Sequence, residues 1–562
     1  MTSNRPLLIA MGILAALIVV VGILIFLVIG GGDDDEPSTA TGTATPGDPD
    51  DGDGDGGGGG NELRLIGGEP LTLDPHVTQD ATSALYIVEI FGGLLTLDPE
   101  LRIQPDLAEE IPTEENGGKV INGDGTVTYT FTIRQDALFH DRKPVTAEDV
   151  KYSLERAADP ATQSLVAEFF LGDIVGVDEK LRGEATEVSG IEVVSDFTVA
   201  ITIEQDLPSF LYKMTYPTSF VVDRTQVENN PNWTRSPNGT GPFSLGEWRL
   251  GERLVLEANE RYHLGAPNVD TVRYLLAGSP ITLYEAGEID VAGVGLTDLT
   301  RIQDPADPLN AEYVSGSRLS IDYIGFNTET PPFDDPNVRR AFAMAIDKEQ
   351  IASAIFQDAV PVADSIIIPG MAAYNEDAST VPFDPEEAIR LLEESEYGGP
   401  DGLPDIFLAE SGLGATSGPA TSAIVEMWRD NLGVEVEIEQ AEAATFFQDV
   451  AQGRYQMFLL GWIMDYPDEE DLLNIHFDSE SPNNDTFYSN PEVDDLLREA
   501  ILEPDAEARI GLYQEAEQLI LDDVPWFPLF HDRFHALVKP YVENYLIPPA
   551  IVPRLRFVSL TE

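Results

Sequence analysis

The sequence predicts an α/β protein of at least two domains, and three observations support this. The chain has 562 residues, more than one hydrophobic core normally organises. Apolar and polar residues alternate in short segments such as 127–133, as they do in strands with one buried face. Asp-Pro or Asn-Pro pairs precede amphipathic stretches at 335, 384 and 490, which is typical of capped helix starts.

The individual elements alternate between strand and helix along the chain. Thr146 and Asp149 form a capping box that opens a helix. The Gly-Thr-Gly-Pro sequence at 239–242 predicts a tight turn where backbone passes close to another segment. The other expected elements are strands at 63–66, 434–438 (an edge strand) and 456–460, a helix over 84–89, hairpins around 122–125 and 191–204, and an apolar stretch over 526–530.

Composition excludes several classes of function. The chain has 100 acidic and 32 basic residues and a formal charge of -68. Such a surface does not suit nucleic acid, which is bound by basic proteins. There is no cysteine, and therefore no disulfide, thiolate metal site or thiol for lipid attachment.

The first sixty residues predict a membrane tether. Residues 7–30 are apolar and uncharged, and at 1.5 Å per residue they span roughly 36 Å, enough to cross a bilayer. Arg5 precedes them and acidic residues follow, so we expect residues 1–6 in the cytoplasm and the rest outside it. No signal-cleavage site is evident after the apolar run. Residues 31–61, rich in Gly, Asp, Thr and Pro, form a flexible linker.

Within the linker, residues 51–62 match the spacing of an EF-hand calcium loop. No amphipathic helix flanks them, and a Gly/Asp-rich linker produces such matches by composition. We therefore expect no calcium site.

No catalytic motif is present. The chain has no H-E-x-x-H, no G-x-S-x-G and no Cys/His cluster. His531 and His535 could share a helix face, but no third metal ligand is apparent. The acidic run 468–471 is interpreted as a solvated turn and helix start. We expect no metal, no cofactor and no enzymatic activity.

The most informative stretch is 461–468. After an apolar strand, Gly461 and Trp462 lead to Asp465, a carboxylate beside Tyr466. Burying a charge among aromatic side chains costs free energy unless the charge pairs with a cation or accepts several hydrogen bonds. Asp465 therefore either caps the next segment or pairs with an internal Arg, or it binds the ammonium group of a ligand. The residue types alone leave both interpretations open.

The chain from about residue 61 onward resembles the family 5 extracellular solute-binding proteins, which serve ATP-binding-cassette importers of peptides and nickel. The motifs occur in the family's order over some 500 residues. They include Leu-Asp-Pro at 73–75, Phe-Gly-Gly-Leu at 91–94, Gly-Thr-Gly-Pro-Phe at 239–243, Glu-Ala-Gly-Glu-Ile-Asp at 285–290, Val-Arg-Arg-Ala-Phe-Ala at 338–343, the stretch 461–468 and Val-Pro-Trp-Phe-Pro-Leu at 524–529.

The resemblance implies a two-lobed periplasmic-binding-protein-like fold of type II, with an extra subdomain in lobe one. Lobe one would comprise 62–325 and 531–562, with the subdomain at about 106–234. Lobe two would comprise 326–530.

In oligopeptide-binding members of the family, the Asp after Gly-Trp pairs with the ligand's α-amino group; here that residue is Asp465. The implied ligand site is Gly461, Trp462, Asp465 and Tyr466, holding an extended peptide between the lobes. The implied partners are permease subunits and the membrane, with the protein monomeric. Bacterial members are usually anchored by a lipidated Cys, and residues 7–30 would replace it here.

Three alternatives remain open on the sequence. The same fold could bind a nickel chelate, a sugar or an opine. The chain could be an extracellular carboxylate hydrolase, since its many acids always allow a catalytic pair. It could also be a receptor subunit that signals without import.

Overall fold

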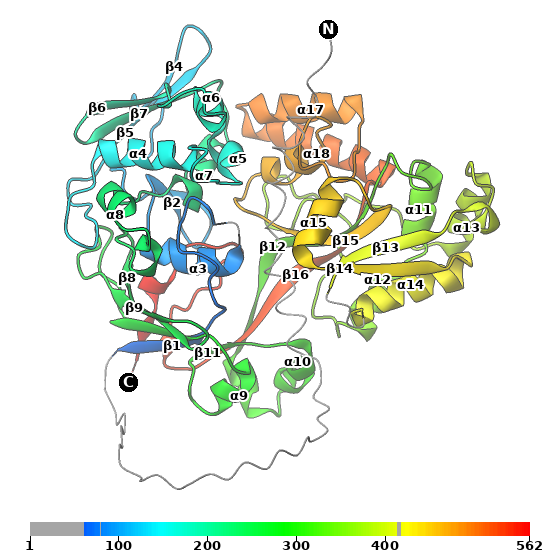
Figure 1. Cartoon of the computed structure of the whole chain (residues 1–562). Coiled ribbons are helices and arrows are strands. Elements are labelled where there is room, and N and C mark those ends of the chain that lie inside the picture. Colours follow the sequence, from blue (N-terminus) through cyan, green and yellow to red (C-terminus); the bar gives the residue numbers. More distant parts are fainter. Residues whose placement is uncertain (1–60, 79, 413–416, 562) are drawn as a thin grey trace, which may run out of the picture.

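The computed structural model describes residues 61–78, 80–412 and 417–561. They form two bodies joined by two long strands, β12 and β16 (Figure 1). The predicted cytoplasmic tip, membrane anchor, linker up to residue 60 and calcium-loop positions 51–60 lie outside these residues. In the part that is described, no helix is both long and apolar enough to cross a membrane. The same part holds no metal-binding group of His, Cys, Asp and Glu side chains.

The base of the first body is a four-stranded sheet in the order β1-β10-β9-β8. Strand β1 runs parallel to β10 and the other pairs are antiparallel. The helix α3 (Ala81–Ile90) packs on this sheet through Ile87 and Ile90, which are fully buried. The strands are β1 (Glu62–Ile66), β8 (Phe243–Arg249), β9 (Arg253–Ala258) and β10 (Thr271–Leu275).

The upper part of the first body is a second sheet in the order β4-β5-β7-β6 (Figure 1). Both predicted hairpins are confirmed. The predicted capping box of Thr146 and Asp149 opens α4. The elements are β4 (Lys119–Ile121), β5 (Val127–Thr132), α4 (Ala147–Ala157), α5 (Ala167–Leu171), α6 (Val177–Leu181), β6 (Ile191–Ser195), β7 (Thr198–Ile203), α7 (Phe210–Lys213) and α8 (Arg224–Asn229).

A six-stranded sheet in the order β11-β16-β12-β15-β13-β14 runs from β11, beside β1 at the base of the first body, into the second body (Figure 1). Strand β14 is an edge strand, as predicted. The strands are β11 (Val291–Gly293), β12 (Tyr313–Phe326), β13 (Ile406–Ser411), β14 (Val436–Ala441), β15 (Met457–Ile463) and β16 (Trp526–Val538).

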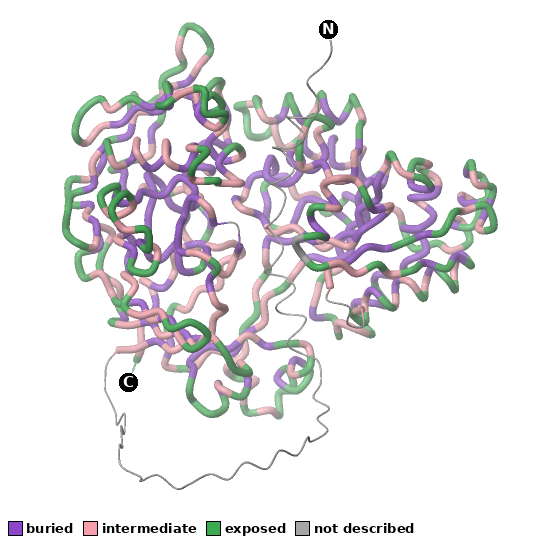
Figure 2. Tube along the Cα trace, in the orientation of Figure 1, coloured by how far each residue is buried: buried purple, intermediate pink, exposed green. Residues whose placement is uncertain are grey.

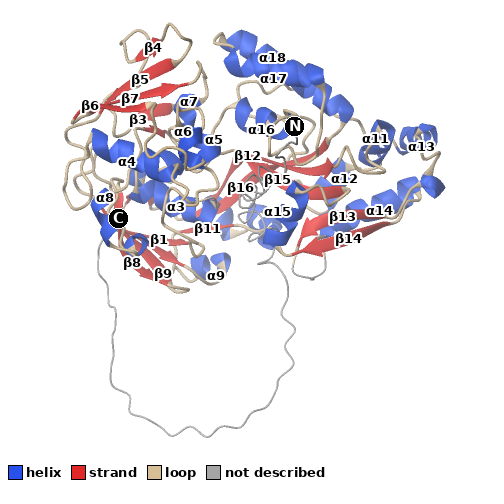
Figure 3. Cartoon of the chain, turned by 45° about the horizontal axis from the view of Figure 1, so that its top comes forward, coloured by secondary structure: helices blue, strands red, loops and turns tan. Residues whose placement is uncertain are grey.

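Helices cover both faces of this sheet (Figure 3). Along β15 the side chains alternate, so Met457 belongs to one core and Phe458 to the other. Three of the helices start at the predicted caps Asp335, Asp384 and Asn490. The first core includes α11 (Pro336–Met344), α12 (Lys348–Ala354), α13 (Pro385–Glu394) and α14 (Pro419–Leu432); the second includes α15 (Ala443–Ala451), α16 (Leu473–Phe477), α17 (Pro491–Leu502) and α18 (Ala506–Asp523).

The two long strands carry the chain between the bodies. Strand β16 pairs with β11 at one end, and β12 pairs with β15 at the other. The pairing of β12 with β16 is interrupted between Ser317 and Ile321, in the stretch between the bodies. His531 and His535 both lie on β16, so the expectation that they share a helix face is wrong. Figure 2 shows buried segments concentrated inside each body, with exposed residues at the periphery.

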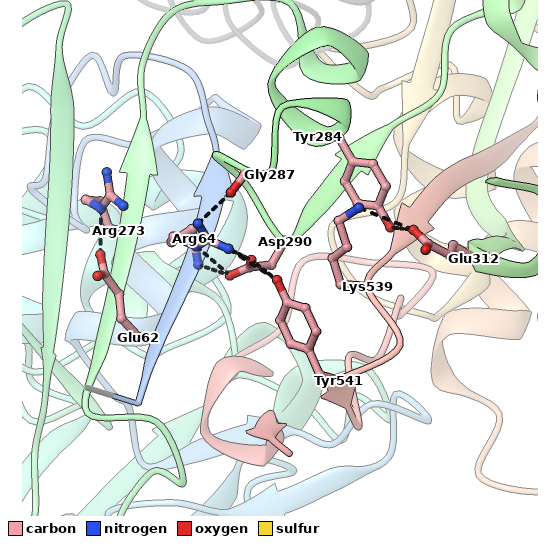
Figure 4. A network of polar contacts seen from close by, with 9 residues as sticks. All are labelled: Glu62, Arg64, Arg273, Tyr284, Gly287, Asp290, Glu312, Lys539 and Tyr541. Atoms are coloured by element: carbon pink, nitrogen blue, oxygen red, sulfur yellow. Dashed lines mark hydrogen bonds and ion pairs between the residues drawn. The ribbon is translucent and has the colours of Figure 1, made fainter. Parts of the chain in front are cut away.

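The C-terminal segment returns to the first body through a polar network (Figure 4). The buried carboxylate of Asp290 accepts hydrogen bonds from the backbone N–H of Arg64 (2.7 Å), from the Arg64 guanidinium and from the Tyr541 hydroxyl (2.7 Å). Beside it, Lys539 lies 3.6 Å from the ring centre of Tyr284 and pairs with Glu312. These contacts fix the end of β16 and the following turn onto the base of the first body.

The smaller elements are β2 (Leu95–Leu97), β3 (Ile103–Pro105), α9 (Pro280–Glu285), α10 (Leu296–Gln303), β17 (Val542–Glu543) and β18 (Ser559–Leu560).

We predict that Asp290→Ala lowers the free energy of unfolding by about 3 kcal/mol, because it leaves the Arg64 guanidinium without its buried partner. Arg273→Ala serves as the control, since its pair with Glu62 on the same sheet is about one-third exposed at both side chains. It is expected to cost less than about 1 kcal/mol. Equal losses in chemical denaturation would contradict the role given to Asp290.

Candidate functional site

A narrow cleft lies where the end of β15 meets the first body. Its free volume of about 50 Å³ has room for a few water-sized groups. Its lining contains two carboxylates, Asp80 and Asp465, and no basic residue. The lining residues are Asp80, Ala81, Ala84, Val88, Thr96, Leu97, Thr215, Tyr216, Pro217, Phe220, Ile463, Met464, Asp465, Ile551, Val552 and Pro553.

Asp465 lies two residues after the end of β15 and lines this cleft. Its backbone N–H donates a hydrogen bond to Asp471 Oδ2 at 2.8 Å. Burial raises the pKa of the Asp465 carboxyl to about 7, and no basic side chain in the described ranges lies close enough to oppose that shift. The interpretation that Asp465 pairs with an internal Arg is therefore wrong. The carboxyl lacks a cation and is open to the cleft.

The opposite wall comes from the first body. The Tyr216 ring stacks on Phe170, with centroids 3.7 Å apart and planes 7° apart. Burial, and after it the carboxylates of Asp465, Asp471 and Asp80, raise the pKa of Tyr216 well above its usual value. The sequence analysis did not identify Tyr216 or Asp80. Only Asp80 carried a signal, since it caps α3 by accepting the Ser83 N–H at 2.8 Å.

The predicted Gly-Thr-Gly-Pro turn positions α3 against the cleft. Gly241 N–H donates to the carbonyl of Ile90, the last residue of α3, at 2.9 Å. A Cβ at Gly239 would lie 2.0 Å from that same carbonyl oxygen. The close backbone approach predicted for this turn is confirmed.

The sequence predicts that the acidic run 468–471 is solvated. That prediction is wrong, because all four residues are buried. Each carboxylate has a different partner, which explains how four acids can be buried together. Asp468 accepts two hydrogen bonds from Arg509, Glu469 accepts the Ala373 N–H, Glu470 pairs with Lys213, and Asp471 accepts the Asp465 N–H.

One of these contacts joins the two bodies. Lys213, at the end of α7, lies 2.9 Å from Glu470 and 2.9 Å from Asp173. Burial alone would lower the pKa of Lys213, but the two carboxylates raise it above its usual value. Burial alone would raise the pKa of Glu470, but Lys213 holds it below its usual value. The pair therefore stabilises the contact between the bodies in their charged forms.

The other predicted site residues have distinct places. Gly461 lies inside β15 opposite Asp322. The Trp462 ring packs edge-on against His476 at 4.4 Å, outside the cleft lining. Tyr466 is fully buried among Phe169, Phe170 and Tyr212 of the first body and donates its hydroxyl to Glu470. Of the four predicted residues, Asp465 alone lines the cleft.

We predict that Glu470→Gln opens the ligand-free protein. The substitution keeps the shape of the side chain and leaves Lys213 its partner Asp173, so the loss is confined to the contact between the bodies. A hydrogen bond between charged groups contributes about 2 kcal/mol, and its loss is expected to increase the radius of gyration in small-angle scattering. Glu469→Gln, in the same turn but bonded within the second body, is the control. Identical scattering from both variants would rule out this role for Glu470.

Comparisons with known proteins agree with this geometry. Residues 102–484 match the family model "Bacterial extracellular solute-binding proteins, family 5 Middle". The chain is 30% identical over 499 residues to the periplasmic oligopeptide-binding protein OppA of Salmonella typhimurium, a match that covers 85% of this chain and 88% of OppA. It is 29% identical over 492 residues to the probable deoxycholate-binding periplasmic protein YgiS of Escherichia coli, covering 85% and 89%.

The fold has solved counterparts as well. The structure of the murein tripeptide binding protein MppA of Escherichia coli superposes with a TM-score of 0.73 at 25% identity. The match covers 89% of this chain and 98% of MppA. The chain therefore has the two-lobed α/β fold of periplasmic binding proteins.

Proposed function

The chain belongs to the family 5 bacterial extracellular solute-binding proteins, and from this premise we propose that it captures peptides in its cleft and delivers them to an ATP-binding-cassette importer. The observation that carries the proposal is Asp465, a half-buried residue whose carboxyl faces a cleft without any basic residue in its lining. A peptide's α-ammonium group supplies the missing charge.

Strand β15 offers backbone groups to such a peptide. Its pairing with β13 covers only Met457 and Phe458, whereas its pairing with β12 continues to Ile463. In the described chain, the stretch 459–463 therefore has a strand neighbour on one side only. An extended peptide adds there by strand addition, through backbone bonds that accept any side chain.

Closure completes the site. The ligand favours the closed form when it contacts both bodies, because only differential affinity shifts a conformational equilibrium. Here Asp465 comes from the second body, and Tyr216 and α3 come from the first. Tyr466 and the Lys213–Glu470 pair hold the same interface from behind the cleft.

The finer organisation is part of the proposal. Lobe one comprises 62–325 and 531–562, with its extra subdomain near 106–234, and lobe two comprises 326–530. The irregular pairing around Ser317–Ile321 supports a hinge in the strands that cross between them. We further propose that residues 7–30 anchor a monomer to the membrane, with the binding domain outside the cytoplasm.

We predict that Asp465→Asn weakens the binding of an unblocked peptide by about 2–5 kcal/mol, since it removes the partner of a desolvated ammonium group. An N-acetylated peptide, which lacks that charge, is expected to bind poorly to the wild type and to be little affected by the substitution. Asp401→Asn, at an exposed site in the second body, is the control. Calorimetry that finds equal affinity of the wild type and Asp465→Asn for the unblocked peptide would remove Asp465 from the site.

The pH dependence follows from the same carboxyl. Its pKa is raised to about 7 without ligand, so below that pH the protonated form predominates and must lose a proton to pair with an ammonium group. We expect peptide affinity to be about half its maximum at pH 7, where half of the carboxyl is ionised, and to fall progressively as the pH is lowered from 7 to 5. Calorimetric titrations across this range test the slope, and Asp465→Asn is expected to flatten it.

A further inference from the structure

Three buried polar atoms lie without hydrogen-bond partners beside the unpaired stretch of β15. Within the described residues, Asp485 Oδ1, Tyr323 Oη and His476 Nε2 have no such partner. All three are on the face of the six-stranded sheet covered by α15–α18. Buried polar atoms are nearly always satisfied in native proteins, so their grouping here points to a missing polar guest.

Asp485 is held rigidly by its loop. The Asn484 side-chain amide donates a hydrogen bond to the Tyr488 carbonyl, and its oxygen accepts one from the Tyr488 N–H. The backbone N–H of Thr328 donates to the carbonyl of Thr486. Burial raises the pKa of the Asp485 carboxyl to about 7, and no cation in the described ranges opposes it. This carboxyl therefore resembles Asp465: it is built into a fixed position without a positive partner.

His476 supplies a second acceptor next to Asp485. Its Nδ1 lies 3.3 Å from the carbonyl of Asn483, which can only accept, so Nδ1 carries the proton. Burial lowers the pKa of the ring to about 3, so the ring is neutral and Nε2 holds a free lone pair. The same Asn483 carbonyl also accepts the backbone N–H of Asp485 at 2.9 Å, so the Asp485 backbone and the His476 ring share one acceptor.

A continuous stack of buried aromatic rings connects this group to the cleft strand. Tyr323 stacks on Trp526 at 3.4 Å, and Trp526 lies 4.8 Å from His476. His476 in turn contacts Trp462 of β15. Tyr323 is also the cross-strand neighbour of Leu460, within the stretch that lacks a second strand. Side chains of a peptide added along β15 alternate between the two faces of the sheet, so every second one points toward this stack.

We propose that Asp485, with His476 beside it, selects a cargo peptide that carries a basic side chain. Two acceptors, aromatic walls and no internal cation suit the ammonium or guanidinium group of a lysine- or arginine-like residue. This inference rests on the proposed peptide-binding function and adds a specificity-determining residue to it.

The test is calorimetry with tetra-alanine peptides in which the second, third or fourth residue is replaced in turn by lysine, arginine, norleucine or glutamate. For one position, we expect the wild type to bind the lysine or arginine peptide at least about tenfold more tightly than the norleucine peptide, the difference of a single charge-assisted bond. Asp485→Asn is expected to abolish this preference and to bind the norleucine peptide as the wild type does. Glu480→Gln, an exposed acid in the same loop, is expected to keep it.

Separate outcomes distinguish the two proposals. Failure of every peptide to bind overturns peptide capture and this inference together. Tight binding without preference for a basic residue at any position overturns this inference alone, and so does a preference that Asp485→Asn retains. Asp485→Ser is a second variant, smaller and uncharged, in case the amide perturbs the loop; its expected loss of preference is the same.

Discussion

The structure depends on a turn of four consecutive buried acids, residues 468–471. Removing an ion from water costs several kcal/mol in a protein interior, so four adjacent carboxylates can be buried only if the surrounding chain satisfies each one separately. Arg509 of α18, the backbone at Ala373, Lys213 of the first body and the backbone at Asp465 do so. Because these partners come from distant segments, the turn fixes the end of β15, the packing of α18 and the approach of the other body at once.

The same turn makes the cleft electrostatically incomplete. Asp471 accepts the backbone N–H of Asp465, and burial, and after it Asp465, raise the pKa of the Asp471 carboxyl well above its usual value. Asp471 therefore supplies no counter-charge, and Lys213, which reaches this turn, is already shared by Glu470 and Asp173. The cleft thus has acceptors and no donor cation. For an unoccupied cleft, protonation near neutral pH is the less costly state, and a cationic guest reverses that balance. Under the proposed function, ligand binding and closure are coupled through charge as well as through shape.

Local features of the fold were accessible from the sequence because they arise from neighbouring residues. The capping box at Thr146, the caps at Asp335 and Asn490, and the close approach at Gly239 depend on short-range chemistry and are all confirmed. The placement of Asp465 at the cleft followed from a family motif. Burial of the 468–471 run and the role of Tyr216 were not predicted, because both depend on residues from other parts of the chain, such as Arg509, Ala373 and Lys213 for the acidic run. A run of acidic residues has the same sequence pattern whether its carboxylates hydrogen-bond to water or to a distant residue such as Arg509. The sequence alone therefore cannot distinguish a solvated run from a buried one.

The large negative charge of the chain and the acids of the cleft act over different ranges. Formal charge of -68 attracts cations of every kind, but at physiological ionic strength exposed charges are screened beyond about 8 Å. Surface charge therefore concentrates basic peptides without distinguishing one from another. Asp465 is screened less because it is half-buried, and its attraction depends on the position of the guest's charge. Selection consequently belongs to the few desolvated carboxylates, and the remaining acids set solubility and the rate of encounter.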